Sequence, residues 1–130
     1  MAQCDAAFLP LQDTPFNQLK SNLKAIEAGA HGLAILASDV LYKRSLIDGV
    51  TAQLFSDSAE LQRHLKLWRA EPDRVRRLGS QARLWVEREC MAAHQISQID
   101  DWYRDLASRR EELTQALFKR VPELDARAAD

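Results

Sequence analysis

Polar side chains that suit a phosphate and a ribose share one face of a helix that the pattern predicts over residues 15–30. They follow one another at short helical steps, and at about 100° per residue this brings them to one side. These residues are Asn17, Lys20, Ser21, Lys24, Glu27 and His31. Lysine amines offset phosphate charge, and a carboxylate accepts hydrogen bonds from vicinal hydroxyls. The row predicts binding of a nucleoside diphosphate.

A solvated helix surface is the alternative interpretation of this polar face. Amphipathic helices ordinarily carry lysine and glutamate on the side that faces water. Lys20 and Lys24 are also four residues apart, a spacing at which like charges repel. Both interpretations stay open on the helix alone.

The adjoining face of the same helix is apolar and is predicted to be core. Its members are Phe16, Leu19, Leu23, Ile26 and Ala30. Thr14 is placed to cap this helix, and Pro15 suits its first position, where a missing N–H costs nothing. We therefore expect one continuous helix with a buried apolar stripe.

Two apolar runs flank this helix and are typical of buried strands. They cover residues 6–11 and residues 33–37, and Gly32 forms the turn before the second. Together the three elements predict a βαβ unit whose parallel strands are buried on both faces. Ligands of open parallel sheets bind outside the carboxyl ends of the strands. The loop over residues 12–15 lies at such an end, which favours a binding role for the polar face.

The rest of the chain is predicted to be one short strand followed by helices. The strand covers residues 51–55, and residues 56–58 cap a helix over residues 59–70. Pro72 opens the next helix. Its predicted core positions are Val75, Leu78, Ala82, Trp85 and Val86. One further helix is expected over residues 92–110, and a weaker one ends at Pro122.

Several short motifs follow one another in a fixed order. They are residues 9–17 (LPLQDTPFN), Lys20-Ser21 with Lys24 and Glu27, residues 30–32 (AHG), Ala37-Ser38, residues 47–51 (IDGVT), Leu54-Phe55, residues 71–73 (EPD) and residues 83–86 (RLWV). In this order and spacing they resemble the donor-binding segment of GT-B glycosyltransferases of the group 1 or family 4 type. The likeness covers roughly residues 6–106.

This resemblance implies an α/β fold: half of a Rossmann-like GT-B donor domain, with about three parallel strands and a helix-rich C-terminal half. It implies that Glu27 holds the ribose of the donor nucleotide. Lys20, Ser21 and Lys24 would lie near the pyrophosphate, and Asn17 near the donor sugar or phosphate. The substrate would be a nucleotide sugar such as a UDP- or GDP-sugar, with no cofactor and no metal.

One position departs from the family pattern. Many retaining members carry another glutamate eight residues before the ribose glutamate, and here that position is Leu19, on the apolar face. Asp13 in the preceding loop is a candidate for part of that role.

The length of 130 residues allows one domain with a real core. A two-domain GT-B enzyme needs several hundred residues, so we expect only the C-terminal part of such an enzyme here. Residues 1–107 are expected to form part of the donor domain and residues 108–130 a helical extension that frays at its end. The expected function is donor binding for transfer of a hexose to a glycan or another acceptor, with the chain inactive alone. The alternative is a non-catalytic α/β association module or remnant.

The strand over residues 6–11 is expected to be an edge. The three predicted strands match the last three of the family's six-stranded sheet, so the neighbour of the first is missing. This strand carries no charge that would discourage pairing with another chain. We therefore expect a homodimer across this edge or association with the missing N-terminal half.

Composition narrows the class of protein. The net charge of -1 and the 46% of hydrophobic residues exclude the basic footprint of a nucleic-acid-binding protein and a disordered composition. No apolar run approaches the ~20 residues of a membrane span, and the first five residues lack a basic signal region, so the expected location is the cytoplasm. Cys4 and Cys90 are expected to be free thiols.

Two other sets of residues have alternative roles. His31 precedes Gly32, where it either completes the helix end or contacts a donor sugar. Arg74, Arg76 and Arg77 suggest a phosphate patch, but their place opposite an apolar stripe favours a solvated face.

Overall fold

The computed structural model describes residues 4–124, and residues 1–3 and 125–130 lie outside it. One compact unit ends at Met91 and a second begins at Ala92, and each is described by itself. The expected fraying of the last residues concerns positions outside the described range. The domain boundary expected between residues 107 and 108 stays a prediction.

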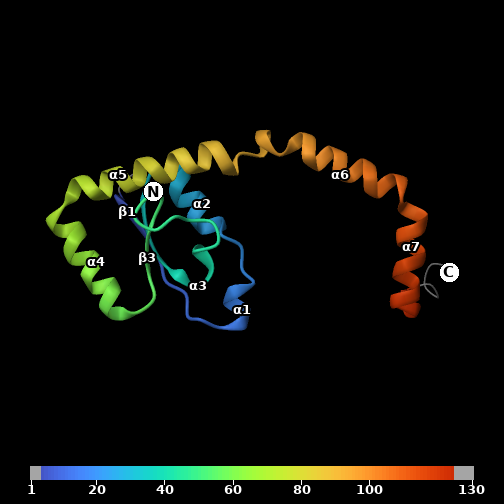
Figure 1. The fold of residues 1–130 in the computed structure, drawn as a ribbon, viewed down its shortest axis with the longest axis horizontal. Helices are drawn as coiled ribbons and strands as arrows, with labels where there is room; N and C mark the ends of the chain where they lie inside the picture. The colour runs from blue at the N-terminus through green and yellow to red at the C-terminus, as the bar shows by residue number, and fades with distance from the viewer. Residues whose placement is uncertain (1–3, 125–130) are drawn as a thin grey trace. The chain divides into compact units, whose positions relative to one another are not determined.

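Three parallel strands form one sheet in the first unit (Figure 1). β1 (Ala6–Leu9) pairs with β2 (Ala34–Ser38), and β2 pairs with β3 (Gln53–Phe55). The helices of this unit are α1 (Pro15–Gln18), α2 (Leu23–Ala30), α3 (Asp39–Tyr42), α4 (Ser58–Ala70), α5 (Pro72–Trp85) and the π-helix η1 (Val86–Cys90). This arrangement corresponds to half of a Rossmann-like domain, which confirms the predicted fold class.

β2 is the central strand and is buried along its whole length, as its uninterrupted apolar run requires. Its side chains alternate between two cores. Ile35 and Ala37 join the core that includes residues of α2 and α3. Ala34 and Leu36 join the core that includes Trp68 of α4 and residues of α5. The sheet is therefore covered on both faces.

β1 is not buried on both faces, so that prediction was wrong. Ala6 and Phe8 are exposed, whereas Ala7 and Leu9 are half-buried against the α2 core. The exposed face is the one toward α4, where an open groove lies beside Ala6 and Phe8. β1 has a neighbour on one side only, in agreement with the expectation that it is an edge strand.

The single helix expected over residues 15–30 was also wrong, because residues 19–22 separate α1 from α2. Thr14 caps α1 as expected, with its hydroxyl accepting the N–H of Asn17 at 3.2 Å. The N–H groups of Leu19 and Lys20 then bond to carbonyls three residues earlier, a tight turn that ends the helix.

Most of the apolar stripe predicted as core faces solvent instead, and only Ile26 of its five residues is half-buried. Phe16 is 73% exposed and Leu19 is 86% exposed. The buried positions of α2 are the small residues Ala25, Ala28 and Gly29.

Close packing of α2 against α5 and η1 explains this choice of small residues. A Cβ added to Gly29 would lie 2.8 Å from Val86 Cγ2 and 3.0 Å from the carbonyl oxygen of Ala82. A Cβ added to Gly79 of α5 would overlap the carbonyl oxygen of Gly32. Gly32 has a φ of 68°, so it ends α2 in the left-handed conformation that favours glycine.

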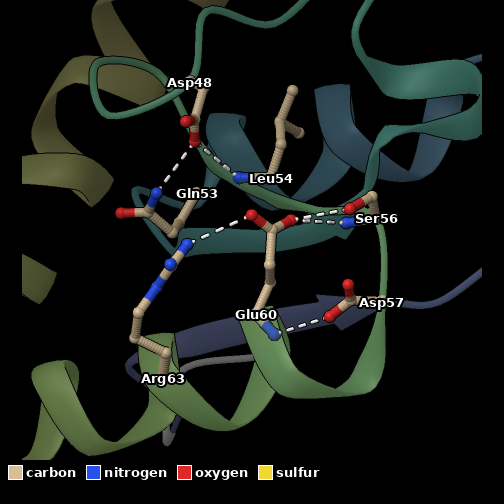
Figure 2. A network of polar contacts seen from close by, with 7 residues as sticks. All are labelled: Asp48, Gln53, Leu54, Ser56, Asp57, Glu60 and Arg63. Atoms are coloured by element: carbon tan, nitrogen blue, oxygen red, sulfur yellow. Dashed lines mark hydrogen bonds and ion pairs between the residues drawn. The ribbon is translucent and has the colours of Figure 1, made fainter.

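α4 begins with a reciprocal pair of caps similar to a capping box, which Figure 2 shows. The carboxylate of Asp57 accepts the N–H of Glu60 at 2.8 Å. In return, the Glu60 carboxylate accepts the N–H of Ser56 at 3.0 Å and its hydroxyl at 2.8 Å. Arg63 lies on the other oxygen of Glu60 at 3.1 Å. The cap predicted at residues 56–58 is confirmed, with Asp57 as the capping residue.

Acid is expected to weaken this start of α4 through Glu60. Two hydrogen bonds from Ser56 hold the pKa of Glu60 below its usual value. The bond from the backbone N–H has the larger effect, and the bond from the hydroxyl comes second. A carboxyl with a lowered pKa in the folded state stabilises the fold above its unfolded pKa, and this contribution is lost as the pH falls through the folded pKa. Below about pH 4.3, urea unfolding should therefore show a steeper loss of stability for the wild type than for Glu60→Gln.

The matched variant Ser56→Ala keeps the backbone hydrogen bond to Glu60 and removes only the hydroxyl. Its pH dependence should lie between the other two. Parallel pH profiles for the wild type and Glu60→Gln would contradict the role of this carboxylate.

The second unit contains the 3-10 turn η2 (Ala92–His94), α6 (Ile96–Ser108) and α7 (Arg110–Arg120). The continuous helix expected over residues 92–110 was wrong at both ends. α7 ends before Pro122, as predicted. The large exposed apolar side chains of α6 are Ile96, Ile99, Trp102 and Tyr103. Among the described helices of either unit, none has the length and apolar character to cross a membrane.

Candidate functional site

The loop after β1 is held in place at the carboxyl end of the sheet. The N–H of Leu11 donates to the hydroxyl of Ser38, at the end of β2, over 2.9 Å. The side-chain amide of Asn17 donates to the carbonyl of Gln12 at 2.8 Å. These bonds fix residues 10–14 beside the ends of the first two strands.

A cavity of about 640 Å³ opens at this edge. It is lined by Leu11, Gln12, Asp13, Gln18, Ser38, Asp39, Val40, Lys43, Arg44, Phe55 and Ser56. These residues follow or end all three strands, or belong to α1 and the α3 segment. Its size is within the range of about 300–1,000 Å³ typical of small-molecule sites.

Four charged side chains line the cavity and are partly paired. Lys43 Nζ lies 3.6 Å from Asp39 Oδ2, and Arg44 Nη1 donates to the carbonyl of Gln18 at 3.0 Å. The side chain of Gln18 in turn donates to Asp13 Oδ1 at 2.6 Å. The Lys43 amine and the Arg44 guanidinium give the cavity two cationic hydrogen-bond donors for an anion.

The polar face predicted from the sequence does not line this cavity. Of its residues and Asp13, only Asp13 lines the cavity. Lys24 Nζ pairs with Glu27 Oε2 at 3.0 Å. Lys20 Nζ lies 5.0 Å from the centre of the Phe16 ring. Ser21 is exposed in the segment between α1 and α2.

The charge of Lys24 nevertheless acts on Tyr42 of the helix that leads to the cavity cations. Burial raises the pKa of Tyr42, and the charge of Lys24 acts on the same hydroxyl in the opposite direction. Tyr42 is the last residue of α3 and directly precedes Lys43 and Arg44. Ala25, the residue after Lys24, and Tyr42 belong to the same buried core cluster.

His31 lies at the opposite end of the strands. It follows α2 as the C-cap residue and lines a hollow with Asp5, which precedes β1. Of its two predicted roles, this position favours the structural one at the end of α2.

Cys4 and Cys90 are free thiols. Burial, and then the charge of Glu89, raises the pKa of Cys90, which disfavours the nucleophilic thiolate. The arginines at residues 74, 76 and 77 line another hollow, where Arg76 pairs with Asp73 and Arg74 Nη2 donates to Gln53 Oε1 at 3.1 Å.

Sequence reasoning missed Lys43 and Arg44. The rule that ligands gather at the carboxyl ends of strands was applied to the loop after the first strand alone. The same rule applied to the second strand points to the segment after Ser38, in which α3 carries the chain one turn onward to these two cations.

Comparison with known proteins assigns the chain to a family. The family model described as glycosyl transferase-like matches residues 2–101. No curated protein and no solved structure matches the chain. The family match covers most of the 130 residues and includes the whole sheet and the cavity at its carboxyl edge. The chain therefore belongs to the glycosyl transferase-like family.

Proposed function

We propose that this chain binds a nucleotide-sugar donor, with the diphosphate in the cavity at the carboxyl ends of the strands and the ribose on Glu27. The observation that carries the proposal is the pair Lys43 and Arg44, which line a cavity at the sheet edge where open α/β folds bind nucleotides. Membership of the glycosyl transferase-like family supports a sugar nucleotide over other anions.

Lys24 and Glu27 are the residues of the polar face of α2 that would bind the donor. Their ion pair is exposed, with 70% of the Lys24 side chain accessible. Such pairs contribute about 0–1 kcal/mol, so a ligand can readily replace them. Glu27 would then accept the ribose hydroxyls, and Lys24 would face the phosphates together with Lys43 and Arg44.

Sugar transfer would require an acceptor and also the protein groups that act on it. In this proposal the chain contributes donor binding, and the groups that orient and deprotonate an acceptor belong to another domain or chain. The 130-residue chain alone would therefore bind donor without transferring the hexose to a glycan or another acceptor.

Substitutions at the proposed ribose contact and at the proposed phosphate contacts are expected to have different effects on ligand binding. Glu27→Ala should weaken binding of UDP or GDP by about 1.5–3 kcal/mol, the range for hydrogen bonds to a charged group. This is roughly a ten- to hundredfold rise in Kd. Arg44→Ala and Lys24→Ala should weaken the binding of nucleoside diphosphates more than the binding of nucleosides. Calorimetry with UDP, GDP and dTDP measures each.

The controls are Lys66→Ala and Arg69→Ala, which remove exposed cations from α4, away from the cavity lining. They should leave Kd unchanged. If the folded wild type binds none of the three diphosphates at millimolar concentration, the donor-binding proposal is wrong, and the association-module alternative is favoured.

A further inference from the structure

The two edges of the sheet differ in whether their outward backbone N–H and C=O groups have hydrogen-bond partners. At β3, the carboxylate of Asp48 accepts the N–H of Leu54 and the side-chain amide of Gln53, each at 2.8 Å (Figure 2). Asp48 also forms a bridge with Ala52. The chain therefore blocks its own β3 edge.

The β1 edge is open in the described part of the chain. The N–H of Ala34 donates to the carbonyl of Asp5, so in the parallel ladder Asp5, Ala7 and Leu9 direct their backbone groups to β2. By alternation, Ala6 and Phe8 direct theirs away from the sheet. No described residue pairs with these outward groups.

An apolar groove of about 320 Å³ lies beside this open edge. It is lined by Ala6, Ala7, Phe8, Leu36, Leu61, Leu65 and Trp68, none of them charged. Phe8 stacks on Phe55 with ring centres 5.8 Å apart, yet 53% of Phe8 is exposed. An uncharged groove beside unpaired strand groups is suited to an apolar strand.

We propose that a second copy of this chain occupies the edge, with its β1 antiparallel to the first and Ala7 opposite the partner's Ala7. This register makes Ala6 and the partner's Phe8 a hydrogen-bonded pair, and the same pair forms on the other side of the two-fold axis. The outward groups of both strands are thereby satisfied, because each such pair exchanges two hydrogen bonds.

The side chains of β1 complement themselves in this register. Ala6 is small and opens onto the groove, so the partner's Phe8 directly opposite has room to cover Leu65 and Trp68. No like charges meet, because β1 has none and Asp5 lies opposite the partner's Leu9. The two-fold contact is closed, as in most homodimers.

The first test is the mass of the full chain in solution. Light scattering on the wild type should give twice 14.8 kDa, and Ala6→Lys should give 14.8 kDa, because a charge on the edge opposes pairing. Ala70→Lys adds the same charge at an exposed position of α4 away from the groove lining and should stay dimeric. Unchanged circular dichroism shows that Ala6→Lys is folded.

The second test fixes the register. In the background Cys4→Ser and Cys90→Ser, Ala7→Cys should form an intermolecular disulfide under mild oxidation, because opposite residues of a non-hydrogen-bonded pair have Cα atoms about 4.5 Å apart. Asp5→Cys should not cross-link, since its copies would lie about 13 Å apart along the strands. A wild-type monomer at high micromolar concentration overturns the proposal. So does a dimer in which Ala7→Cys fails to cross-link, which would place association at another surface.

Discussion

Replacing Trp68 with alanine is expected to lower the free energy of unfolding by about 3–5 kcal/mol, the range for large aromatic truncations in a core. Trp68 is 8% exposed and packs in one buried cluster with Ala34 and Leu36 of the central strand and Leu78 of α5. Its loss leaves a void that the surrounding backbone cannot close. Urea unfolding followed by circular dichroism measures the change.

Two variants separate packing from the other properties of this tryptophan. The buried Nε1 of Trp68 has no hydrogen-bond partner, so Trp68→Phe, which keeps an aromatic ring and removes that N–H, should cost much less than Trp68→Ala. Trp102 of α6 is 55% exposed, and Trp102→Ala should stay within about 0.5 kcal/mol of the wild type. Similar losses for Trp68→Ala and Trp102→Ala would contradict the assigned core.

Gly79→Ala is expected to destabilise the fold by about 1–3 kcal/mol, the usual cost of overpacking. Helix propensity alone predicts the opposite sign, because alanine is favoured over glycine by about 1 kcal/mol inside a helix. The added methyl would overlap the carbonyl oxygen of Gly32 and lie 3.2 Å from the backbone nitrogen of Ala34. Both are backbone atoms of a packed turn and strand, so neither can move aside as a flexible side chain would.

The control is Gln81→Ala, an exposed position on the same helix, which should change stability by less than about 0.5 kcal/mol. Thermal or urea unfolding of the two variants tests the sign directly. A stabilised Gly79→Ala protein would show that α5 does not approach the turn at Gly32 this closely.

The fold class was predictable because it depends on local signals that tertiary structure did not override. The apolar run over residues 33–37 has the length and composition of an interior strand, and β2 is buried throughout. Thr14 and Asp57 are short polar residues directly before helices, and both accept the hydrogen bonds expected of caps.

The orientation of α2 was not predictable from apolar periodicity. Large side chains at helical spacing usually mark the core, but here the neighbouring helix comes so close at Gly29 that there is room only for Ala25 and Ala28 beside it. Leu23 of this helix is therefore on the exposed side. Phe16 and Leu19 do not belong to α2 at all, because the helix is broken at residues 19–22. The distance between two helices is a property of the assembled fold, and no residue of α2 alone encodes it.

The candidate site was predicted where it follows the first strand and missed where it follows the second. Asp13 lies one loop after β1 and lines the cavity as the position of that loop suggests. Lys43 and Arg44 reach the same cavity only because Ser38 ties the two strand ends together and α3 turns the chain back. Such a convergence depends on the order of the strands as well as on their existence.

The carboxylate of Asp48 also limits how far this sheet can grow. Because it already accepts the outward N–H of Leu54, a further strand could be added only at β1. A molecule in which only one sheet edge can pair with another strand forms a finite assembly. If both edges could pair, copies would add without end into fibrils. In the proposed dimer, one acidic side chain in a turn would thus separate a terminating association from an open-ended one.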